Sequence, residues 1–424
     1  MTRLLIDGRG TKPRALPPAA SGPGRRLGGG ALLMAGALLT GGLNYLYSLA
    51  LIRLLPAPEF AKVASLNSLL LIAGTVAAAT IPWVVAREVS NSTARSARRR
   101  RAVSFALVAS VSGGMLAAAV IALLQLRYTD PALLVLSGTA GVAIFVSSVA
   151  AGQLQGEQRF GRLVVFRLLE VTVKVATGLV LAYVTRSAVA GIAGFAVAAV
   201  GCALYGLWLV RAELSRPTLQ AALGRDLWRH AAGIGSVQGA VALLQATDVI
   251  VLGLTVGNTT AVAGYQAMQV IGRTPVFLAG AVAIAVFPRL SREADTRRAW
   301  TLFRRSLRTY LIAAGALTLI IGLFPPGIAR LIFPASYGVH HHLLLPVALA
   351  GFAAGLLTLL ATWCQATDRY RLVLSLLGAG VLLTATVLAP MAADITRTAW
   401  ATAGCLYALS AALWLLARGR QDRP

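Results

Sequence analysis

Long apolar segments alternate along the chain with short breaks that are polar or rich in glycine and proline. A membrane-spanning helix needs roughly 20 mostly apolar residues, and cutting the sequence at these breaks gives about twelve such segments. We expect the spans at approximately 29–52, 60–87, 102–126, 131–152, 162–184, 187–210, 231–253, 261–288, 307–325, 342–366, 371–389 and 398–417. The pattern therefore predicts an all-α, polytopic membrane protein.

The composition agrees with this interpretation. Of the 424 residues, 57% are hydrophobic and only 12% are charged, whereas charged residues make up about a quarter of a soluble globular domain. The three cysteines, Cys202, Cys364 and Cys405, all lie inside apolar segments. Their spacing fits neither a disulfide framework nor a zinc site, so we interpret them as packing residues.

The net charge of +25 is distributed between the apolar segments and does not form one basic domain. This distribution argues against nucleic acid as a partner. When successive connections are assigned to opposite sides, about 30 of the 39 Lys and Arg residues fall on the side of both termini, including "RSARRRR" (95–101) and "RLSREADTRR" (289–298). The positive-inside rule then places both termini in the cytoplasm of a multi-pass plasma-membrane protein.

A short polar motif occurs twice, as "GQLQGEQRFGRL" (152–163) and "WCQATDRYRLVL" (363–374). The copies follow the fourth and tenth spans, which are equivalent places in two halves of six, although any cytoplasmic turn attracts such residues. Two halves of six insert in the same orientation, so we expect two parallel-repeat six-helix bundles around a central cavity. The expected divisions are a basic disordered cytoplasmic tail (1–27), a bundle (28–211), a cytoplasmic linker (212–230), a second bundle (231–418) and a cytoplasmic tail (419–424).

The connections on the outer side are all short, which leaves no room for an extracytoplasmic catalytic domain. Neither a Walker loop nor a nucleophile elbow is present. We therefore expect no enzyme activity and no cofactor. Two parallel bundles without an outer domain favour a transporter that works by alternating access.

Ionisable side chains inside a span are costly and usually mark a polar path. In the span 162–184, Arg167, Glu170 and Lys174 lie on one helical face, and Lys174 is about 18 Å deep, near the midplane. Arg167 is close enough to the cytoplasmic face to snorkel there. Glu170 could also neutralise Lys174 as a purely structural pair.

Two further spans have polar stripes. The span 261–288 has Gln266, Gln269 and Arg273 at helical spacing, with Pro275 just beyond to loosen the backbone. The span 231–253 has Gln238, Gln245 and Asp248. Arg273 has no acidic neighbour on its own helix, and Asp248 could be a proton or cation site or a packing carboxylate bonded to Gln266.

The buried charges sum to +1, which favours an anionic cargo, and arginine suits bidentate binding of phosphate. The expected substrate-binding residues are Lys174, Arg273, Arg167, Glu170, Gln266, Gln269 and Gln245, with Asp248 coupling transport to H⁺ or Na⁺. The run of His340, His341 and His342 cannot ligate one ion, because successive helical residues point about 100° apart. We expect no metal site there, but an exposed, pH-sensitive rim.

With the spans placed, the chain resembles the polysaccharide-exporter branch of the multidrug/oligosaccharidyl-lipid/polysaccharide exporter superfamily, the lipid-linked oligosaccharide flippases. The residues that carry the resemblance are "RLLPAPEF" (53–60), "TDVIVLGL" (247–254), "VAGYQAMQVIGRTP" (262–275), "FPRLSR" (287–292), "IFPASYG" (332–338) and "QATDRYRL" (365–372). Ala61 stands where a glycine often follows, and "PASY" replaces a Gly-Pro-acidic form. By resemblance, Asp248 matches the family's acidic position in the seventh span, and Tyr265 and Arg273 match its tyrosine and basic positions in the eighth.

The resemblance implies a flippase that translocates a polyprenyl-diphosphate-linked oligosaccharide or a related anionic glycolipid across the plasma membrane for cell-surface polysaccharide assembly. Its expected partners are that glycolipid, membrane lipids, and the glycosyltransferases and polymerase of the same pathway. A multidrug or cation antiporter is the first alternative. A non-transporting scaffold subunit of a cell-envelope assembly complex is the second.

Overall fold

The structure, a computed structural model, describes residues 29–90, 92–93, 96–127, 129–214, 225–257, 259–290, 296–367 and 370–418. These residues form helices and no strand, which confirms the predicted all-α membrane fold. The predicted terminal tails, 1–27 and 419–424, lie outside the described residues, as does most of the predicted linker.

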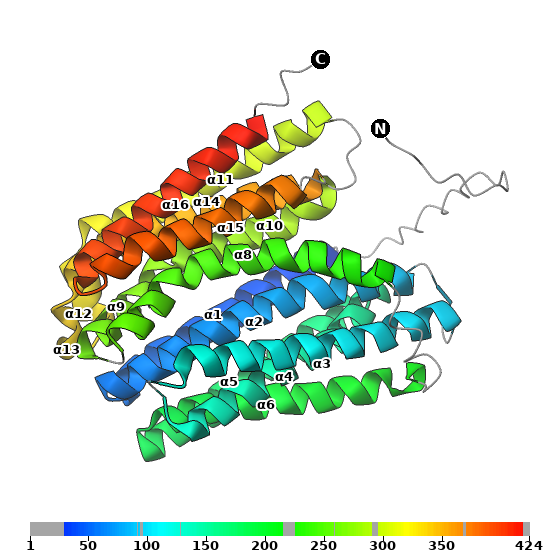
Figure 1. The fold of residues 1–424 in the computed structure, drawn as a ribbon, viewed down its shortest axis with the longest axis horizontal. Helices are drawn as coiled ribbons and strands as arrows, with labels where there is room; N and C mark the ends of the chain where they lie inside the picture. The colour runs from blue at the N-terminus through cyan, green and yellow to red at the C-terminus, as the bar shows by residue number, and fades with distance from the viewer. Residues whose placement is uncertain are drawn as a thin grey trace.

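The helices form two halves, which lie one above the other in Figure 1. The first half consists of α1 (Gly29–Leu54), α2 (Ala57–Ser90), α3 (Ala97–Gln125), α4 (Pro131–Gly156), α5 (Phe160–Thr185), α6 (Ala188–Val210) and the short η1 (Arg211–Glu213). The second half consists of α8 (Arg225–Thr255), α9 (Thr260–Gly272), α10 (Thr274–Leu290), α11 (Thr296–Leu323), α12 (Pro325–Ile332), α13 (Ala335–Gly338), η2 (His341–Leu343), α14 (Leu344–Ala366), α15 (Tyr370–Leu388), η3 (Ala389–Met391) and α16 (Ile395–Arg418).

Equivalent helices pair in the same way in both halves. In the first half, α1 contacts α5, α2 contacts α3 and α4, α4 contacts α3 and α6, and α5 contacts α6. In the second half, α8 contacts α15, α10 contacts α11 and α14, α14 contacts α11 and α16, and α15 contacts α16. The order of partners is preserved, as expected for the two parallel repeats predicted from the sequence.

Ten of the described helices are long and apolar enough to cross a membrane. The two predicted spans outside this set are α5, which has three ionisable side chains in its first half, and the span 261–288. The structure breaks the latter into α9 and α10. Both exceptions contain residues that the sequence marked for the binding site.

The break between α9 and α10 lies at Arg273 and has an identifiable chemical cause. Pro275 has no backbone N–H to continue the helical hydrogen bonds. The carbonyl oxygen of Ile271, which would have received that bond, instead accepts one from the Thr274 hydroxyl at 2.6 Å. The backbone of Gly272 lies directly against Gly351 of α14, where a side chain on Gly351 would collide with it.

Two helices begin earlier than predicted, at the end of the molecule where α1 starts and α16 finishes; below, we call this the termini end. The ninth span was predicted to begin at residue 307, but α11 begins at Thr296 and includes Arg297, Arg298, Arg304 and Arg305. Arginine is a good helix former, so a basic segment outside the membrane continues the helix. Similarly, α8 begins at Arg225, and its Trp228 packs edge-on against Phe105 with ring centroids 5.1 Å apart.

The two halves are joined at the end of the molecule where α12 and α13 lie. One hydrophobic core there combines residues of α1, α2, α4 and α6 with residues of α9, α13 and α14. Across the same junction, Arg53 donates to the carbonyl oxygen of Ile332 at 3.1 Å, and the rings of Phe60 and Tyr337 meet edge-on at 6.1 Å. At the opposite end, the core of the second half is separate from a core built on the first half, to which the second half contributes only the start of α8.

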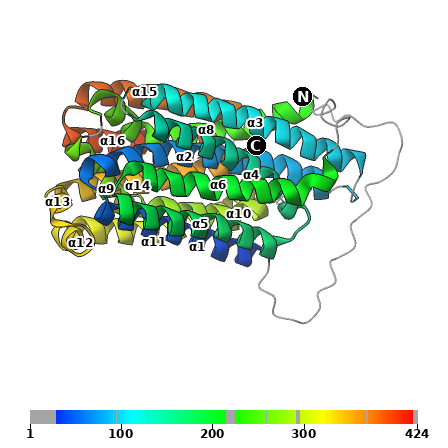
Figure 2. The same ribbon diagram turned by 90° about the horizontal axis from the view of Figure 1, so that it is seen from below.

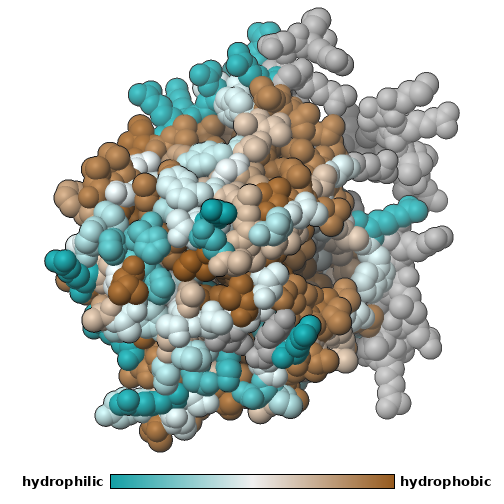
Figure 3. All heavy atoms as spheres, turned by 60° about the vertical axis from the view of Figure 1, so that its left-hand side comes forward, coloured by the Kyte–Doolittle hydropathy of each residue, from teal (hydrophilic) through white to brown (hydrophobic). Residues whose placement is uncertain are grey.

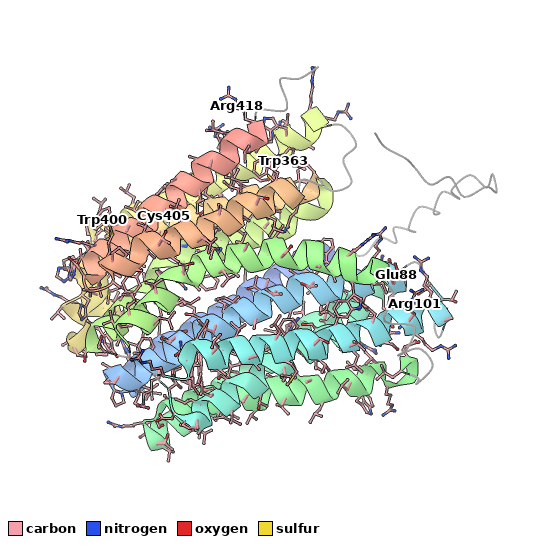
Figure 4. The ribbon with its side chains drawn as sticks, in the orientation of Figure 1. Glu88, Arg101, Trp363, Trp400, Cys405 and Arg418 are labelled. Carbon is pink, nitrogen blue, oxygen red and sulfur yellow. The ribbon has the colours of Figure 1, made fainter. Side chains whose placement is uncertain are left out.

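The two ends of the molecule are visible in three views. Figure 2 shows α12 and α13 side by side at one end of the molecule. In Figure 4, Glu88, Arg101 and Arg418 lie toward the termini end, whereas Trp400 lies at the α12 end. Broad areas of the surface in Figure 3 are hydrophobic, as expected for helices that face lipid.

Candidate functional site

A cavity of about 420 Å³ lies between the two halves, within the usual size range of small-molecule sites. Most of its wall comes from α1, α2 and α5, with one side formed by α9 and α10. The polar and aromatic residues that line it include Thr40, Asn44, Tyr45, Tyr47, Ser48, Asn67, Ser68, Arg167, Glu170, Lys174, Phe195, Gln266, Gln269, Arg273 and Phe277. The cavity is therefore central but is built mainly on the first half.

Lys174 is deeply buried, with 6% of its surface exposed. Its ammonium donates a hydrogen bond to the side-chain oxygen of Asn44. It also lies 5.0 Å from the ring centre of Tyr47 and 4.4 Å from that of Phe195, where the electron-rich ring faces attract a cation. Two aromatic rings and an amide thus hold the charge in the cavity wall.

The sequence left open whether Glu170 neutralises Lys174, and the structure answers this question. Glu170 forms an ion pair with Arg167, one turn away on α5, at 3.0 Å. Among the described residues, Lys174 makes no ion pair. Its positive charge therefore has no directly bonded counter-ion in the cavity wall.

Arg273, at the break between α9 and α10, lies beside Asp248 of α8. Its Nη2 donates to Oδ1 of Asp248 at 3.1 Å and to the backbone oxygen of Gln245 at 2.6 Å. Arg273 has no acidic residue on its own helix, but it is still paired, because Asp248 comes from the neighbouring helix α8. Its Nε and Nη1 have no hydrogen-bond partner among the described residues, and Arg273 lines the cavity.

Asp248 is held by a dense set of donors. Its Oδ2 accepts from the hydroxyl of Tyr265 at 2.7 Å and from the side-chain nitrogen of Gln269, while Oδ1 accepts from the backbone N–H of Val249 at 2.8 Å. Of the two alternatives for Asp248, the one that bonds it to Gln266 does not hold in this form, because its side-chain partners are Tyr265, Gln269 and Arg273. Gln266 lies one turn before Gln269 and donates instead to Ser65 of α2 at 2.9 Å, across the junction of the halves.

The predicted site residues thus form two groups. Arg167, Glu170, Lys174, Gln266, Gln269 and Arg273 line the main cavity. Gln245 and Asp248 lie behind Arg273, around a second hollow of about 20 Å³ in the second half, enough space for about one water molecule. Gln245 donates to Thr358 of α14 at 2.9 Å.

The sequence reasoning missed Asn44, Tyr47 and Phe195, which surround Lys174. A signal for α1 was present, because Thr40, Asn44 and Ser48 repeat every four residues and therefore lie on one helical face. Nothing in the sequence pattern distinguishes Phe195 from the other apolar residues of α6. Its role follows only from the packing of α6 against α5.

The histidine run lies at the α12 end of the molecule. The ring of His340 covers Gly264 of α9 so closely that a side chain there would collide with it. Burial, and to a lesser extent the charge of His342, lowers the pKa of His340 from its usual 6.5. The described part of the chain contains no cluster of three His, Cys, Asp or Glu side chains able to hold a metal.

Comparisons with known proteins agree with this architecture. The family model described as "Polysaccharide biosynthesis protein" matches residues 27–293, more than half of the chain. Among curated proteins, none matches the sequence.

Solved structures of the same fold have little sequence identity to the chain. An inward-facing multidrug resistance MATE family transporter of the MOP superfamily is similar with a TM-score of 0.69 and 15% identity, covering 92% of this chain and 98% of its own. The outward-facing conformation of such a transporter has the same TM-score and identity, covering 92% and 95%. A MOP superfamily transporter from Pyrococcus furiosus, whose binding pocket is described as having reverse polarity, has a TM-score of 0.68 and 16% identity, covering 92% and 95%. These likenesses establish the MOP transporter fold.

Proposed function

This chain belongs to the polysaccharide biosynthesis protein family, and from that premise we propose that it is a flippase for a lipid-linked, anionic glycan. The proposed cargo is an oligosaccharide on a polyprenyl diphosphate, or a related anionic glycolipid. The proposed process is its transfer from the cytoplasmic to the outer leaflet for cell-surface polysaccharide assembly. The family and the transporter fold support a transporter, and the chemistry of the cavity supports the choice of cargo.

The observation that carries the proposal is the charge of the cavity wall. Arg167 is paired with Glu170, and Arg273 is paired with Asp248, so each pair sums to zero. Lys174 makes no ion pair among the described residues, so these five side chains sum to one positive charge at the same cavity. Because Arg273 also has free donors there, an anion such as a diphosphate could bind Lys174 and Arg273 together, with charge-assisted hydrogen bonds to both.

The apolar part of the same cavity suits the lipid. Phe277 of α10 and Leu71 of α2 line the cavity and are 44% and 55% exposed. We assign them to contact with the isoprenoid segment next to the diphosphate. A head group that binds polar residues and a tail that remains with apolar ones is the arrangement that a lipid-linked cargo requires.

Alternating access follows from the way the halves meet. Their shared core and the contacts of Arg53 and Gln266 lie toward the α12 end. On the prediction that the basic termini end is cytoplasmic, this conformation is closed toward the outside. Transport then requires these contacts to break as the two repeats rock about the cavity. Coupling through Asp248 to H⁺ or Na⁺ stays a prediction.

The alternatives are distinguished by the same residues. A cationic drug would be repelled by Lys174, which has no counter-ion, so the charge of the cavity disfavours the multidrug antiporter. A scaffold subunit would tolerate neutralisation of both Lys174 and Arg273. A flippase that grips a diphosphate would not.

The test is to replace Lys174 and Arg273 singly with glutamine and measure the glycan-lipid that reaches the outer leaflet in cells. We expect each variant to reduce delivery at least ten-fold, as for the loss of one charge-assisted contact of about 1.5–3 kcal/mol. Matched controls are Lys62→Gln and Arg397→Gln, which remove the same charges from ion pairs outside the cavity. Undiminished delivery by both cavity variants, at normal membrane insertion, contradicts the proposal.

A further inference from the structure

The ion pair between Arg273 and Asp248 forms part of the boundary between two spaces. Gln269 and Arg273 line both the main cavity and the small hollow behind them, whereas Asp248 lines only the hollow. The carboxylate is 4% exposed and the guanidinium 22% exposed. The positive group therefore faces the cargo space, and its negative partner lies behind it.

The bonding of Asp248 fixes the position of its carboxylate. Four donors converge on its two oxygens, from Tyr265, Gln269, Arg273 and the backbone of Val249. Asp248 bonds only Nη2 of Arg273, so the N–H groups of Nε and Nη1 stay without a partner among the described residues.

We infer that Asp248 is a counter-charge that limits how tightly the cavity holds an anion. This inference rests on the proposed function. An anion bound to the N–H groups of Nη1 of Arg273 lies within one guanidinium width of a fixed carboxylate, which Nη2 bonds, and is repelled by it. Without Asp248 the site would have two uncompensated cations, Lys174 and Arg273, and would bind a diphosphate too strongly to release it after each transport cycle. A transport site must bind its cargo and also let it leave.

A counter-charge and a residue that merely positions Arg273 predict opposite changes in anion affinity when Asp248 is neutralised. If Asp248 is a counter-charge, its neutralisation strengthens anion binding. Coulomb's law at an effective dielectric constant of about 20 makes the effect on the order of ten-fold or more in affinity for one unit charge at this range. If Asp248 only orients the guanidinium, its neutralisation weakens binding.

The experiment measures binding of inorganic pyrophosphate to the full-length protein purified in detergent. Asp248→Asn is expected to lower the Kd at least ten-fold relative to wild type. Asp248→Ser, which removes the charge with a smaller side chain, is expected to lower it too and provides a second route if the asparagine variant does not fold. Asp394→Asn is the matched control, because it removes a carboxylate paired with Arg397 on the exposed surface, and its Kd is expected to stay within about two-fold of wild type.

The outcomes separate this inference from the proposed function. If wild type binds pyrophosphate and Lys174→Gln and Arg273→Gln weaken binding, but neutral variants of Asp248 bind no more tightly, the counter-charge role is wrong and the anion site stands. If wild type and the neutral variants of Asp248 all fail to bind, the anion site itself is contradicted. Tight binding by Asp248→Asn together with slower delivery of glycan-lipid in cells is the combination that supports the inference.

Discussion

Outside the cavity, buried charges hold together the helix ends of the first half that lie opposite the α12 end. Arg99, with 8% of its side chain exposed, pairs with Glu157 in the turn between α4 and α5 and with Glu213 of η1 at 3.0 Å. Glu157 also pairs with Arg159 at 3.1 Å. The first copy of the repeated polar motif therefore has a structural role, since its glutamate ties the basic start of α3 to the turn between α4 and α5, and the same arginine also pairs with η1.

Replacement of Arg99 by alanine is expected to destabilise the protein strongly. It removes the arginine that both Glu157 and Glu213 pair with in a largely buried place, and breaking a buried pair in this way costs about 3–5 kcal/mol. The measurement is thermal unfolding of the purified protein. Arg98→Ala is the control, because Arg98 is 56% exposed in its pair with Glu88 and such surface pairs contribute about 0–1 kcal/mol. Equal melting temperatures for the two variants would rule out this role for Arg99.

How far single residues could be predicted depends on their type. An ionisable residue in an apolar segment is conspicuous, so the sequence identified Lys174, Arg273 and Asp248, and the structure brings them close to one cavity. Their partners could not be assigned, because Asp248 bonds Gln269 and not Gln266, which lies one turn earlier. Phe195 could not be found at all, since an aromatic residue in an apolar helix gives no signal of its own.

Pairs of glycines determine how closely the helices approach one another. Gly194 of α6 lies against the backbone of Gly178 of α5, and a side chain at Gly194 would also meet the carbonyl oxygen of Lys174 at 3.0 Å. Small residues allow this close contact where no hydrophobic effect drives helices together in lipid. The approach places Phe195, the next residue along α6, beside the ammonium of Lys174.

Gly194→Ala is expected to force α5 and α6 apart, cost about 1–3 kcal/mol and reduce delivery of the glycan-lipid by moving Lys174. Gly201→Ala on the same helix is the control, because a side chain there meets nothing within 4 Å. Thermal unfolding and the delivery assay on both variants check the prediction. A Gly194→Ala variant as stable and active as Gly201→Ala would show that the close approach is unimportant.

The helices themselves could be predicted from apolar length alone, and the twelve expected spans all have a counterpart. The first residues of α8 and α11 could not be predicted, because a basic segment in water gives no signal that distinguishes helix from loop. Pro275 indicated a loosened backbone, but not that the span divides at Arg273. That outcome depends on the packing of Gly272 against Gly351, which only the folded structure brings together.

At the scale of the whole molecule, the junction at the α12 end keeps the two halves closed there. Arg53 makes three hydrogen bonds to the carbonyl oxygens of Leu331 and Ile332. Arg53→Ala should therefore raise the population that is open at this end, by roughly two- to ten-fold for the net loss of one hydrogen bond of about 0.5–1.5 kcal/mol. Labelling of a cavity cysteine from the outside medium reports that population.

The labelled site is Asn67→Cys, which lines the cavity on α2, in a chain whose three native cysteines are replaced by alanine. Arg397→Ala is the matched control at the same end, because within the described part of the chain Arg397 pairs only with the exposed Asp394. We expect faster labelling with Arg53→Ala and an unchanged rate with Arg397→Ala. An equal rate in both variants would mean that Arg53 does not hold the junction.

The two-fold organisation was predictable because a short motif recurs at equivalent places, and the matching helix pairs agree with it. The asymmetry of the cavity was not predictable. Each half has its own polar stripes, but only contacts between halves decide that α5 faces the cavity while Gln245 and Asp248 face the interior of the second half. Sequence periodicity shows which face of a helix is polar, and not what lies opposite it.

The central claim is that Lys174 and Arg273 together bind an anionic lipid head group in one cavity. The most direct measurement is mass spectrometry of the lipid that stays bound to the protein after gentle purification from its own membrane. We predict that wild type and Lys62→Gln retain a polyprenyl-diphosphate lipid, and that Lys174→Gln and Arg273→Gln lose it. Equal retention by all four proteins, or no such lipid on wild type, would contradict the account.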